Sequence, residues 1–254
     1  MRTAIVIPAR YGSTRLPGKP LLRSTGKYLI EHVYEQARRA KTATTVVVAT
    51  DDSRILAAVE SFGGIGVMTR KDHPSGTDRI AEVAESLPDI DTIINLQGDE
   101  PLFDPANLDL LAGLLAEDAQ SDVATLATPI RDRETYLSPN CVKVVCDDRG
   151  RALYFSRSPI PFFRDREPEL RAIPPQVLLH LGVYAYRRET LLKLAATPPH
   201  PLEQAEKLEQ LRVLGLGGTI RIGVIASAHR GVDTPADYTA FVEEYRGRGS
   251  RRAA

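Results

Sequence analysis

A short basic segment near the start of the chain has the residue types and spacing of a polyphosphate site. It directly follows an apolar run at residues 4–7 that predicts a buried strand, and it reads Pro8-Ala9-Arg10-Tyr11-Gly12-Ser13-Thr14-Arg15-Leu16-Pro17-Gly18-Lys19. Arg10, Arg15 and Lys19 supply positive charge, and the two glycines let backbone N–H groups approach an anion closely. The segment therefore predicts a phosphate-binding loop at the carboxyl end of the first strand.

The spacing of this loop differs from that of P-loop ATPases and kinases. Their motif has four residues between its glycines and a hydroxyl residue after its lysine. The loop binds the phosphates, and the hydroxyl binds magnesium. This chain has five residues between Gly12 and Gly18, and Pro20 follows the lysine. Pro20 offers neither a magnesium-binding hydroxyl nor a backbone N–H. A solvated basic loop without a ligand is the alternative interpretation.

Two carboxylates stand at positions where they could hold a metal ion. Asp99 follows a predicted strand in Asn95-Leu96-Gln97-Gly98-Asp99-Glu100-Pro101, and Asp233 precedes the last predicted helix in Gly231-Val232-Asp233-Thr234-Pro235. Magnesium is bound by few protein carboxylates, with phosphate oxygens and water completing its shell. Asp99 is therefore the better candidate ligand. Each aspartate could instead cap a helix, and Asp233 joins a metal site only if folding brings it beside Asp99.

A second anion site is possible at the start of a helix expected at residues 76–86. The free N–H groups there, together with the hydroxyls of Ser75 and Thr77, could bind a phosphate or a nucleoside, and Arg70 lies just upstream. The equally good local interpretation is an ordinary Ser or Thr helix cap.

Polar residues of the second half suit an acidic substrate or ordinary packing. Arg157 could hold a carboxylate in a bidentate fork, whereas His180 and Tyr184 have a simple interpretation as packed residues with satisfied polar ends. In a helix expected at residues 203–214, Glu203 and Lys207 are predicted to pair one turn apart.

The composition is that of an ordinary globular protein without a global charge. The 254 residues include 33 Lys and Arg and 33 Asp and Glu, and 43% of them are hydrophobic. Balanced charge gives no basic field for nucleic acid or an acidic membrane, so an anion site has to be local. No apolar run reaches the roughly 20 residues that span a bilayer, and no signal-peptide pattern is present. We expect a cytoplasmic protein with neither nucleic-acid binding nor membrane insertion.

The two cysteines are expected to be free thiols. Cys141 and Cys146 flank an apolar run that predicts a strand. An extended run of this length would separate them by about 16 Å and put them on opposite faces, too far apart for a disulfide. Without Cys or His neighbours they also make a poor zinc site.

Strands and helices are predicted to alternate through the first half. The apolar patterns predict strands at residues 3–8, 45–50, 65–68, 92–97 and 122–128, with helices at 28–40, 53–61, 76–86 and 105–117. This βαβ order predicts an α/β fold, with a mostly parallel Rossmann-like sheet and helices on both faces. In such sheets ligands bind beyond the carboxyl ends of the strands. The lack of a G-x-G-x-x-G after the first strand disfavours a dinucleotide site.

The pattern changes after about residue 130. Shorter strands are predicted at 142–146, 152–155, 182–186 and 220–225, and helices at 188–195, 203–214 and 235–245. The proline-rich residues 158–175 predict a long functional loop. The tail at 246–254 is expected to fray. We expect one α/β unit that carries a smaller lobe.

Taken together, these segments resemble the 3-deoxy-manno-octulosonate cytidylyltransferases, a family of the nucleotidyltransferase superfamily. The resemblance spans nearly the whole chain. It rests on the motifs I-P-A-R-Y-G-S-T-R-L-P-G-K-P, A-T-D-D, M-T-R-x-D-H-x-S-G-T-D-R, N-L-Q-G-D-E-P, Y-F-S-R-S-P-I-P, H-L-G-V-Y-A-Y-R, P-L-E-Q-A-E-K-L-E-Q-L-R and G-V-D-T-P.

The resemblance implies an activity and an organisation. CMP would pass from CTP to the anomeric hydroxyl of 3-deoxy-D-manno-octulosonate (Kdo), releasing pyrophosphate, for lipopolysaccharide biosynthesis. It also implies Mg²⁺ and a homodimer. Within a single domain covering residues 1–254, residues 1–130 would mainly bind the nucleotide, and residues 131–254 would mainly form a smaller lobe for sugar binding and dimerisation. Attack on the α-phosphorus needs no protein nucleophile.

Roles for individual residues follow from the same motifs. The resemblance makes Arg10, Lys19 and Asp99 catalytic and makes Asp99 and Asp233 the metal ligands. The implied nucleotide-binding residues are Pro8, Ala9, Arg10, Lys19, Arg70, Ser75, Gly76 and Gln97. The implied sugar-binding residues are Arg157, His180, Tyr184, Glu209 and Gln210.

Two departures from the family pattern bear on the acceptor and on a helix start. Many members have Lys or Arg where this chain has Leu179, which leaves room for a modified Kdo, and Tyr28 replaces a family proline. The alternative function is a cytidylyltransferase for another acidic sugar, such as an amino-substituted Kdo or a sialic acid. A nucleotide-binding protein without turnover is disfavoured because Arg10, Lys19 and Asp99 are all present.

Overall fold

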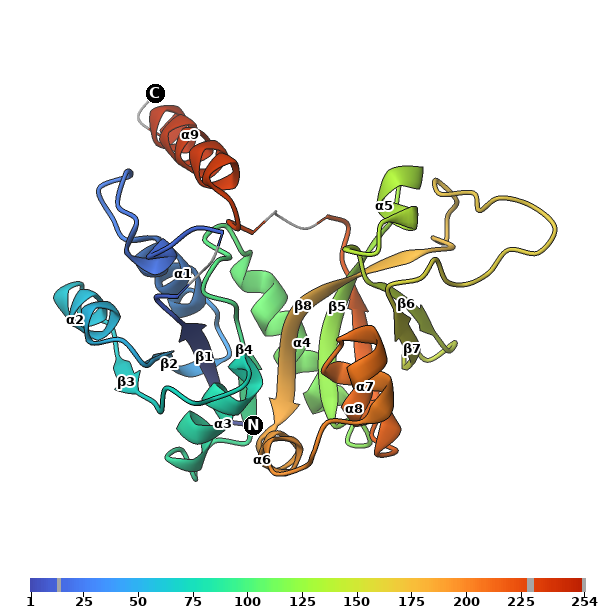
Figure 1. Cartoon of the computed structure of the whole chain (residues 1–254), viewed down its shortest axis with the longest axis horizontal. Coiled ribbons are helices and arrows are strands. Elements are labelled where there is room, and N and C mark those ends of the chain that lie inside the picture. Colours follow the sequence, from blue (N-terminus) through green and yellow to red (C-terminus); the bar gives the residue numbers. More distant parts are fainter. Residues whose placement is uncertain (13–14, 228–230, 253–254) are drawn as a thin grey trace. The chain divides into compact units, whose positions relative to one another are not determined.

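A computed structural model describes residues 1–12, 15–227 and 231–252 (Figure 1). The chain forms two compact units. The first unit consists of Arg2–Asp109 and His229–Ala254, and the second unit consists of Leu110–Ala228. Helix α4, Pro105–Glu117, contains the boundary between them.

Four parallel strands form the sheet of the first unit in the order β3-β2-β1-β4. Their bounds are Thr3–Ala9 for β1, Ala43–Thr50 for β2, Gly66–Met68 for β3 and Thr92–Asn95 for β4. In β1, Ile5 pairs with Val46 of β2 and Ile94 of β4, and all three side chains are buried. Burial of both faces is what a continuous apolar run in a parallel sheet predicts.

Three helices connect these strands, and a fourth lies at the end of the unit. The helices are α1 (Leu29–Arg38), α2 (Ser53–Ser61), α3 (Gly76–Glu85) and α9 (Pro235–Arg252), with a short 3-10 helix η1 at Lys19–Leu21. Helices α1 and α2 pack on β2, whereas α3 packs on β1, β2 and β4. Since crossovers are right-handed and the chain reverses direction along the sheet after β3, α3 is expected on the face opposite α1 and α2.

The second unit has a mixed sheet around β5. Strand β5 (Val123–Pro129) pairs in parallel with β9 (Ile220–Val224) and antiparallel with β8 (Leu178–Arg187). Strands β6 (Lys143–Cys146) and β7 (Ala152–Ser156) form an antiparallel hairpin, and β6 also pairs with β8. The helices of this unit are α5 (Arg133–Leu137), α6 (Arg188–Ala195), α7 (Pro201–Glu206) and α8 (Gln210–Gly215).

The predicted α/β class, with a mostly parallel sheet and a smaller lobe, is confirmed, but two predicted segments differ from the structure and one helix was not predicted. The helix expected at residues 203–214 is two helices, because Lys207 adopts a left-handed conformation with φ 54° and ends α7. The tail expected to fray from residue 246 continues α9 as far as Arg252. The sequence patterns also missed the short helix α5.

The predicted pair of Glu203 and Lys207 does not form. Glu203 instead makes a two-pronged ion pair with Arg212, in which Nη2 lies 2.6 Å from Oε1 and Nε lies 2.7 Å from Oε2. The turn at Lys207 makes this possible because it folds α8 back toward α7. Both side chains of the pair are nearly buried, at 12% and 10% exposed, so this ion pair belongs to the interior of the second unit.

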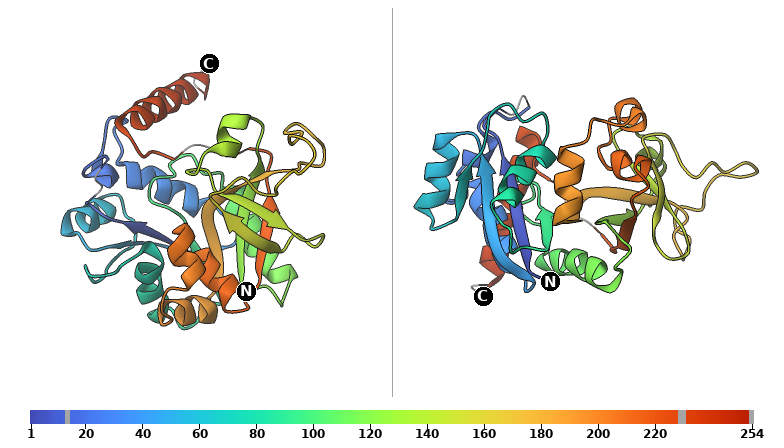
Figure 2. Two further views of the ribbon diagram at one scale, coloured as in Figure 1. Left: turned by 45° about the vertical axis from the view of Figure 1, so that its right-hand side comes forward. Right: turned by 90° about the horizontal axis from the view of Figure 1, so that it is seen from below.

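The proline-rich residues 158–175 form the long loop that the sequence predicted. It contains no regular helix or strand and extends away from the strands of the second unit (Figures 1 and 2). Phe162 and Ile173 in this loop are 85% and 91% exposed. A functional role for the loop stays a prediction.

Cys141 and Cys146 are both free thiols, as expected. Burial raises the pKa of the Cys146 thiol to about 11, which makes it unreactive at neutral pH. Among the helices of the described residues, none has the length and apolar character needed to cross a membrane.

Candidate functional site

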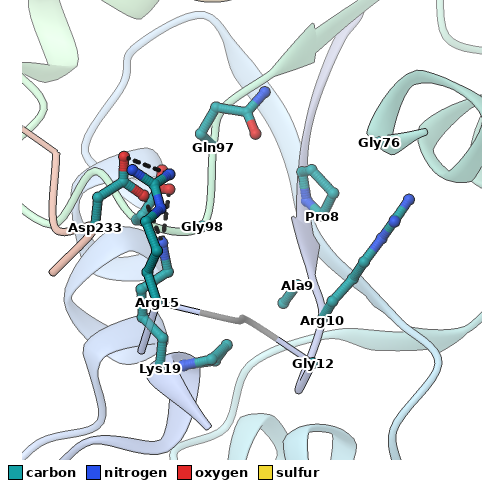
Figure 3. Close-up of a pocket in the computed structure, with 12 residues that line it drawn as sticks. Pro8, Ala9, Arg10, Gly12, Arg15, Lys19, Gly76, Gln97, Gly98 and Asp233 are labelled. Atoms are coloured by element: carbon teal, nitrogen blue, oxygen red, sulfur yellow. Dashed lines mark hydrogen bonds and ion pairs between the residues drawn. The ribbon is translucent and has the colours of Figure 1, made fainter. Parts of the chain in front are cut away.

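A cavity of about 370 Å³ lies in the first unit, where the loops that follow β1 and β4 meet (Figure 3). It contains all the predicted nucleotide-binding residues except Arg70 and Ser75, together with both predicted metal ligands. Its lining consists of Pro8, Ala9, Arg10, Gly12, Arg15, Lys19, Pro20, Gly76, Gln97, Gly98, Asp99 and Asp233. The cavity has the position expected for a ligand site in a parallel sheet.

The ammonium group of Lys19 joins the two predicted metal ligands. Its Nζ lies 2.8 Å from Oδ2 of Asp99 and 3.2 Å from Oδ1 of Asp233. Arg15 reaches the same cluster, with Nη2 3.2 Å from Oδ2 of Asp233 (Figure 3). The fold therefore brings two carboxylates that are far apart in the sequence to one point of the cavity wall. Their role as metal ligands stays a prediction.

Neighbouring residues cap the adjacent helix, which leaves Asp233 available to Lys19. Thr234 and Asp237 form a reciprocal cap at the start of α9: the Asp237 N–H donates to Oγ1 of Thr234 at 3.2 Å, and the Thr234 N–H donates to Asp237 at 2.9 Å. The N–H of Val232 also donates to the Asp99 carbonyl at 2.8 Å. This backbone bond connects the two segments that carry the carboxylates.

Sequence reasoning missed Glu100, which lies behind the two carboxylates. Burial, followed by the negative charges of Asp99 and Asp233, raises the pKa of the Glu100 carboxyl from 4.5 to about 8. Glu100 is therefore mostly protonated at neutral pH, and it adds little negative charge to the site. The sequence shows only that Glu100 adjoins Asp99, because the burial that is the larger cause of the shift depends on the fold.

Gly98 allows the loops after β1 and β4 to touch through their main chains. A Cβ atom at Gly98 would lie 2.8 Å from the carbonyl oxygen of Pro8, a distance that real Cβ atoms do not show. Any other residue would push the two loops apart. The position of Asp99 relative to the phosphate-binding loop thus depends on this glycine.

The three cations of the predicted phosphate-binding loop are divided between two sides of the cavity. Arg15 and Lys19 face Asp233, whereas Arg10 points toward the Gly76 side (Figure 3). Nη2 of Arg10 is 3.4 Å from the carbonyl oxygen of His73, and within residues 1–12, 15–227 and 231–252 Arg10 makes no ion pair. Its charge remains available to an anion. Residues 13 and 14 of the predicted loop lie outside the described residues.

Arg70 and Ser75 do not line this cavity. The guanidinium of Arg70 is largely exposed, with Nε 3.7 Å from Asp72 and 3.9 Å from Glu82. Ser75 is the N-cap of α3: its hydroxyl donates to the Asp78 carboxylate at 2.7 Å and accepts from the Asp78 N–H at 3.3 Å. The cap interpretation of Ser75 therefore holds locally, and the nucleotide-binding role of both residues stays a prediction.

His180 and Tyr184, two of the predicted sugar-binding residues, lie together in the second unit. The ring of His180 is 4.9 Å from Phe155 and 5.4 Å from Tyr184, and its Nε2 is 3.1 Å from Oγ1 of Thr125. Burial lowers the pKa of His180 to about 3, so the imidazole is neutral. Burial, with Tyr186 and Glu209 nearby, raises the pKa of Tyr184. These side chains are hydrogen-bonding groups and not charges.

Glu209 and Gln210, at the start of α8, are also in this region of the second unit. Glu209 is close enough to Tyr184 to affect its pKa. Gln210 is only 6% exposed, and its Nε2 has no hydrogen-bond partner in the described part of the chain. An unsatisfied buried amide is unfavourable, so Gln210 has a donor available for a ligand.

The Arg157 guanidinium holds main-chain carbonyls of its own unit. Nε donates to Glu206 at 2.7 Å, Nη1 to Pro139 at 2.9 Å and Nη2 to Lys207 at 3.4 Å. Arg157 therefore secures the end of α7. Its predicted carboxylate contact would have to use the remaining N–H groups.

Comparison with known proteins identifies the family. Residues 4–220 match the family described as Cytidylyltransferase. The chain is 50% identical to the 3-deoxy-manno-octulosonate cytidylyltransferase of Geotalea daltonii, over 98% of this chain and 100% of the relative. The corresponding protein of Geobacter sulfurreducens is 49% identical, over 96% of this chain and 99% of its own length. The chain belongs to the 3-deoxy-manno-octulosonate cytidylyltransferase family.

A solved structure supports the same assignment of this cytidylyltransferase. CMP:2-keto-3-deoxy-manno-octonic acid synthetase complexed with CTP matches with a TM-score of 0.90 and 46% identity, over 98% of this chain and 100% of that chain. The chain is thus a nucleotidyltransferase with the fold and family that its motifs predicted.

Proposed function

We propose that this cytidylyltransferase transfers CMP from CTP to the anomeric hydroxyl of Kdo, giving CMP-Kdo and pyrophosphate for lipopolysaccharide biosynthesis in the cytoplasm. Relatives named for this activity share about half of its residues over nearly the full length. The observation that carries the proposal is the convergence of Lys19, Asp99 and Asp233 on the cavity formed beside the phosphate-binding loop.

The proposed reaction is an in-line displacement at the α-phosphorus of CTP. The anomeric oxygen forms a bond to this phosphorus, its hydroxyl proton passes to solvent, and the bond from the phosphorus to the oxygen of the departing pyrophosphate breaks. Such a reaction depends on positioning and on charge neutralisation more than on covalent catalysis. Arg10 and Lys19 would neutralise the triphosphate from two sides of the cavity, and Gln97 and Gly76 would orient the nucleotide. The protein needs no nucleophile of its own.

The residues of the cavity suit Mg²⁺. Asp99 and Asp233 present hard oxygen ligands to one point, and magnesium typically uses few carboxylates together with phosphate oxygens and water. No cluster of three or more His, Cys, Asp or Glu side chains suited to a metal occurs among the described residues, so the nucleotide would have to complete the shell. We assign Asp99 and Asp233 as the ligands. Bound magnesium would supply Lewis-acid neutralisation of phosphate charge.

Lys19 has to change partners when the substrate arrives. Its ammonium group offsets the charges of Asp99 and Asp233. With CTP and a cation present, those carboxylates gain another partner, and Lys19 can donate to phosphate oxygens. The ion pairs seen here would keep the side chains close to their working positions.

The sugar is assigned to residues of the second unit. His180, Tyr184, Glu209 and Gln210 offer neutral and charged hydrogen-bonding groups suited to the hydroxyls of a sugar acid. Nε2 of Gln210, which has no hydrogen-bond partner among the residues that the structure describes, is a donor in need of an acceptor. Arg157 would donate a hydrogen bond to the carboxylate of the sugar acid. We retain the proposed division into a nucleotide half, residues 1–130, and a sugar and dimerisation half, residues 131–254, and the proposed homodimer.

Leu179 gives little reason to prefer a modified acceptor. Its side chain packs against the apolar cluster of Ile130, Tyr136 and Val177. The loss of the cationic residue common in the family therefore has a packing explanation, and Kdo remains the proposed acceptor ahead of an amino-substituted Kdo or a sialic acid.

Pyrophosphate release tests the proposal directly. The purified protein is incubated with CTP, Mg²⁺ and one sugar acid: Kdo, an amino-substituted Kdo or a sialic acid. We expect release with Kdo that depends on both CTP and Mg²⁺. Release with another acid but not with Kdo would establish the alternative acceptor, and the absence of release with all three would contradict a transferase function for these substrates.

A further inference from the structure

The segment Thr50-Asp51-Asp52, which follows β2, has no part in the proposed chemistry, but Asp52 organises a neighbouring arginine. Oδ1 of Asp52 accepts from the Arg54 N–H at 2.9 Å and so caps α2. The same carboxylate binds the Arg54 guanidinium in a bidentate fork, at 2.9 Å to Nε and 2.6 Å to Nη2. The fork lowers the pKa of Asp52 to about 2. It also fixes the plane of the guanidinium.

The fixed guanidinium lies over an aromatic ring of the phosphate-binding loop. Cζ of Arg54 is 3.4 Å from the ring centroid of Tyr11. A cation this close to the face of a ring is attracted by its quadrupole. Arg54 thus connects the start of α2 to the loop that follows β1.

Tyr11 in turn holds Gly18 in two ways. Its carbonyl oxygen accepts from the Gly18 N–H at 3.1 Å, which closes the loop between these residues. Its ring lies against the Gly18 backbone, where an added Cβ would be 3.2 Å from Cε2 of Tyr11. Gly18 has φ +66°, a conformation that favours glycine, and Lys19 follows it at the start of η1. The contacts therefore run from Arg54 through Tyr11 to the residue before Lys19.

We propose that Tyr11 and Arg54 are positioning residues that hold Gly18 and Lys19 in the arrangement that receives the triphosphate. Neither residue lines the cavity, so both act through the loop and not by touching the nucleotide. The proposal rests on the proposed function, because it assigns the triphosphate to this loop. It gives the A-T-D-D motif a role. The Asp52 carboxylate orients the Arg54 guanidinium, and the guanidinium holds the ring of Tyr11 in place.

A purely structural role for Arg54 would have different consequences. If the Asp52–Arg54 pair only capped α2, its loss would change stability without separating the two substrates. The positioning role predicts that nucleotide kinetics change while sugar kinetics do not, since Tyr11 and Arg54 contact the loop that carries Lys19.

Kinetic measurements on four variants separate these roles. We expect Arg54→Ala to lower kcat/KM for CTP about 3- to 5-fold and Tyr11→Leu about 5- to 10-fold, the range of an aromatic–cation contact and a loop contact. KM for Kdo should stay within about twofold, as expected for a site that the change does not touch. Tyr11→Phe keeps the aromatic ring and should therefore retain a nearly wild-type kcat/KM for CTP and KM for Kdo. Arg2→Ala, which removes an exposed arginine paired with Asp89, is the matched control. Wild-type kcat/KM for CTP in both Arg54→Ala and Tyr11→Leu, or equal losses for both substrates, would overturn the proposal.

Hydrogen–deuterium exchange tests the loop independently of turnover. In the ligand-free protein, the peptide that contains the Gly18 amide should exchange faster in Arg54→Ala and Tyr11→Leu than in wild type, Tyr11→Phe or Arg2→Ala. Unchanged exchange would refute the contact chain even if the wild-type enzyme showed no activity with CTP and Kdo, an outcome that would count against the proposed function alone. If Tyr11→Leu does not fold, the exposed Arg54→Ala variant decides the result by itself.

Discussion

The cavity of the first unit and the predicted sugar-binding region of the second unit hold their polar side chains in different ways. In the first unit, Lys19, Asp99 and Asp233 are charged, paired with one another and located on the wall of a cavity. In the second unit, His180 and Tyr184 are neutral and set by burial and ring contacts. Ion-paired groups can exchange their partners for an anionic ligand and a cation. Neutral buried groups instead select a ligand by its shape and its hydrogen bonds. The contrast matches a triphosphate on one side of the reaction and a sugar acid on the other.

Removal of one cavity carboxylate should have the largest effect. Asp99→Asn is expected to lower kcat about 100- to 1000-fold, the scale on which a group that stabilises transition-state charge contributes. The assay is pyrophosphate release with saturating CTP, Mg²⁺ and Kdo. Asp89→Asn, an exposed carboxylate of the same unit, serves as the control and should be near wild type. If Asp99→Asn kept at least a third of wild-type kcat, the proposed role of the Asp99 carboxylate in the reaction would be contradicted.

Loss of the shared ammonium group should have the next largest effect. We expect Lys19→Ala to lower kcat/KM for CTP about 100-fold, because one cation at the transferred phosphoryl group is lost. Lys27→Ala removes an exposed lysine that pairs with Glu35 and is the matched control. Normal turnover by Lys19→Ala would show that the Lys19 ammonium group, although it pairs with Asp99 and Asp233, does not contribute to the reaction.

The second unit also has a buried ion pair, and we expect it to contribute to stability. Arg212→Ala leaves the nearly buried Glu203 carboxylate without its partner, which should lower the free energy of unfolding by about 3 kcal/mol. Urea denaturation monitored by circular dichroism measures this change. Lys207→Ala, the partner that helical spacing predicted, is the control. Equal stability of the two variants would mean that Arg212 contributes no more than a surface charge.

The smallest predicted effect concerns pH. The folded protein keeps His180 neutral because burial lowers its pKa from 6.5 to about 3, so between these values the unfolded chain binds a proton that the folded state does not. The folded state then loses stability as the pH falls below 6.5, by up to about 1.4 kcal/mol per pH unit. We expect His180→Asn to lose less stability than wild type as the pH falls from about 6.5 to about 3, the interval in which that linkage acts.

His32 of the first unit provides a matched comparison for this pH effect. Burial lowers the pKa of His32 to about 4, so His32→Asn should also reduce the acid-side loss, over a narrower interval that ends near that value. Urea titrations at several pH values measure both slopes. Parallel curves for wild type and both variants would refute the assignment of these imidazoles as neutral.

The sequence patterns predicted the elements of the first unit well because each local signal agrees with its tertiary setting. Strand β1 was expected at residues 3–8 and is Thr3–Ala9, since a run buried on both faces has no competing conformation. The prediction of one helix at 203–214 failed because its helical spacing continues through Lys207 and gives no sign of the left-handed conformation that ends α7 there. The true partner of Glu203 is Arg212, nine positions away, and no helical period suggests it.

The candidate site was only partly predictable. The phosphate-binding loop and Asp99 follow strands, so the fold class alone put them at one edge of the sheet. The position of Asp233 depends on the chain path before α9, and spacing carries no information about that path. The separation of Arg10 from Arg15 also depends on the three-dimensional course of the loop. The sugar-binding residues came from family motifs and not from residue patterns.

The contact between Gly98 and the Pro8 carbonyl has a consequence for how related enzymes can diverge. A side chain at residue 98 would meet that oxygen at 2.8 Å, so the main chains themselves form the junction between the two loops. Substitution at residue 98 therefore offers no way to change the shape or polarity of the pocket. New preferences for a base or a sugar have to evolve through positions around the junction, while the junction itself stays constant.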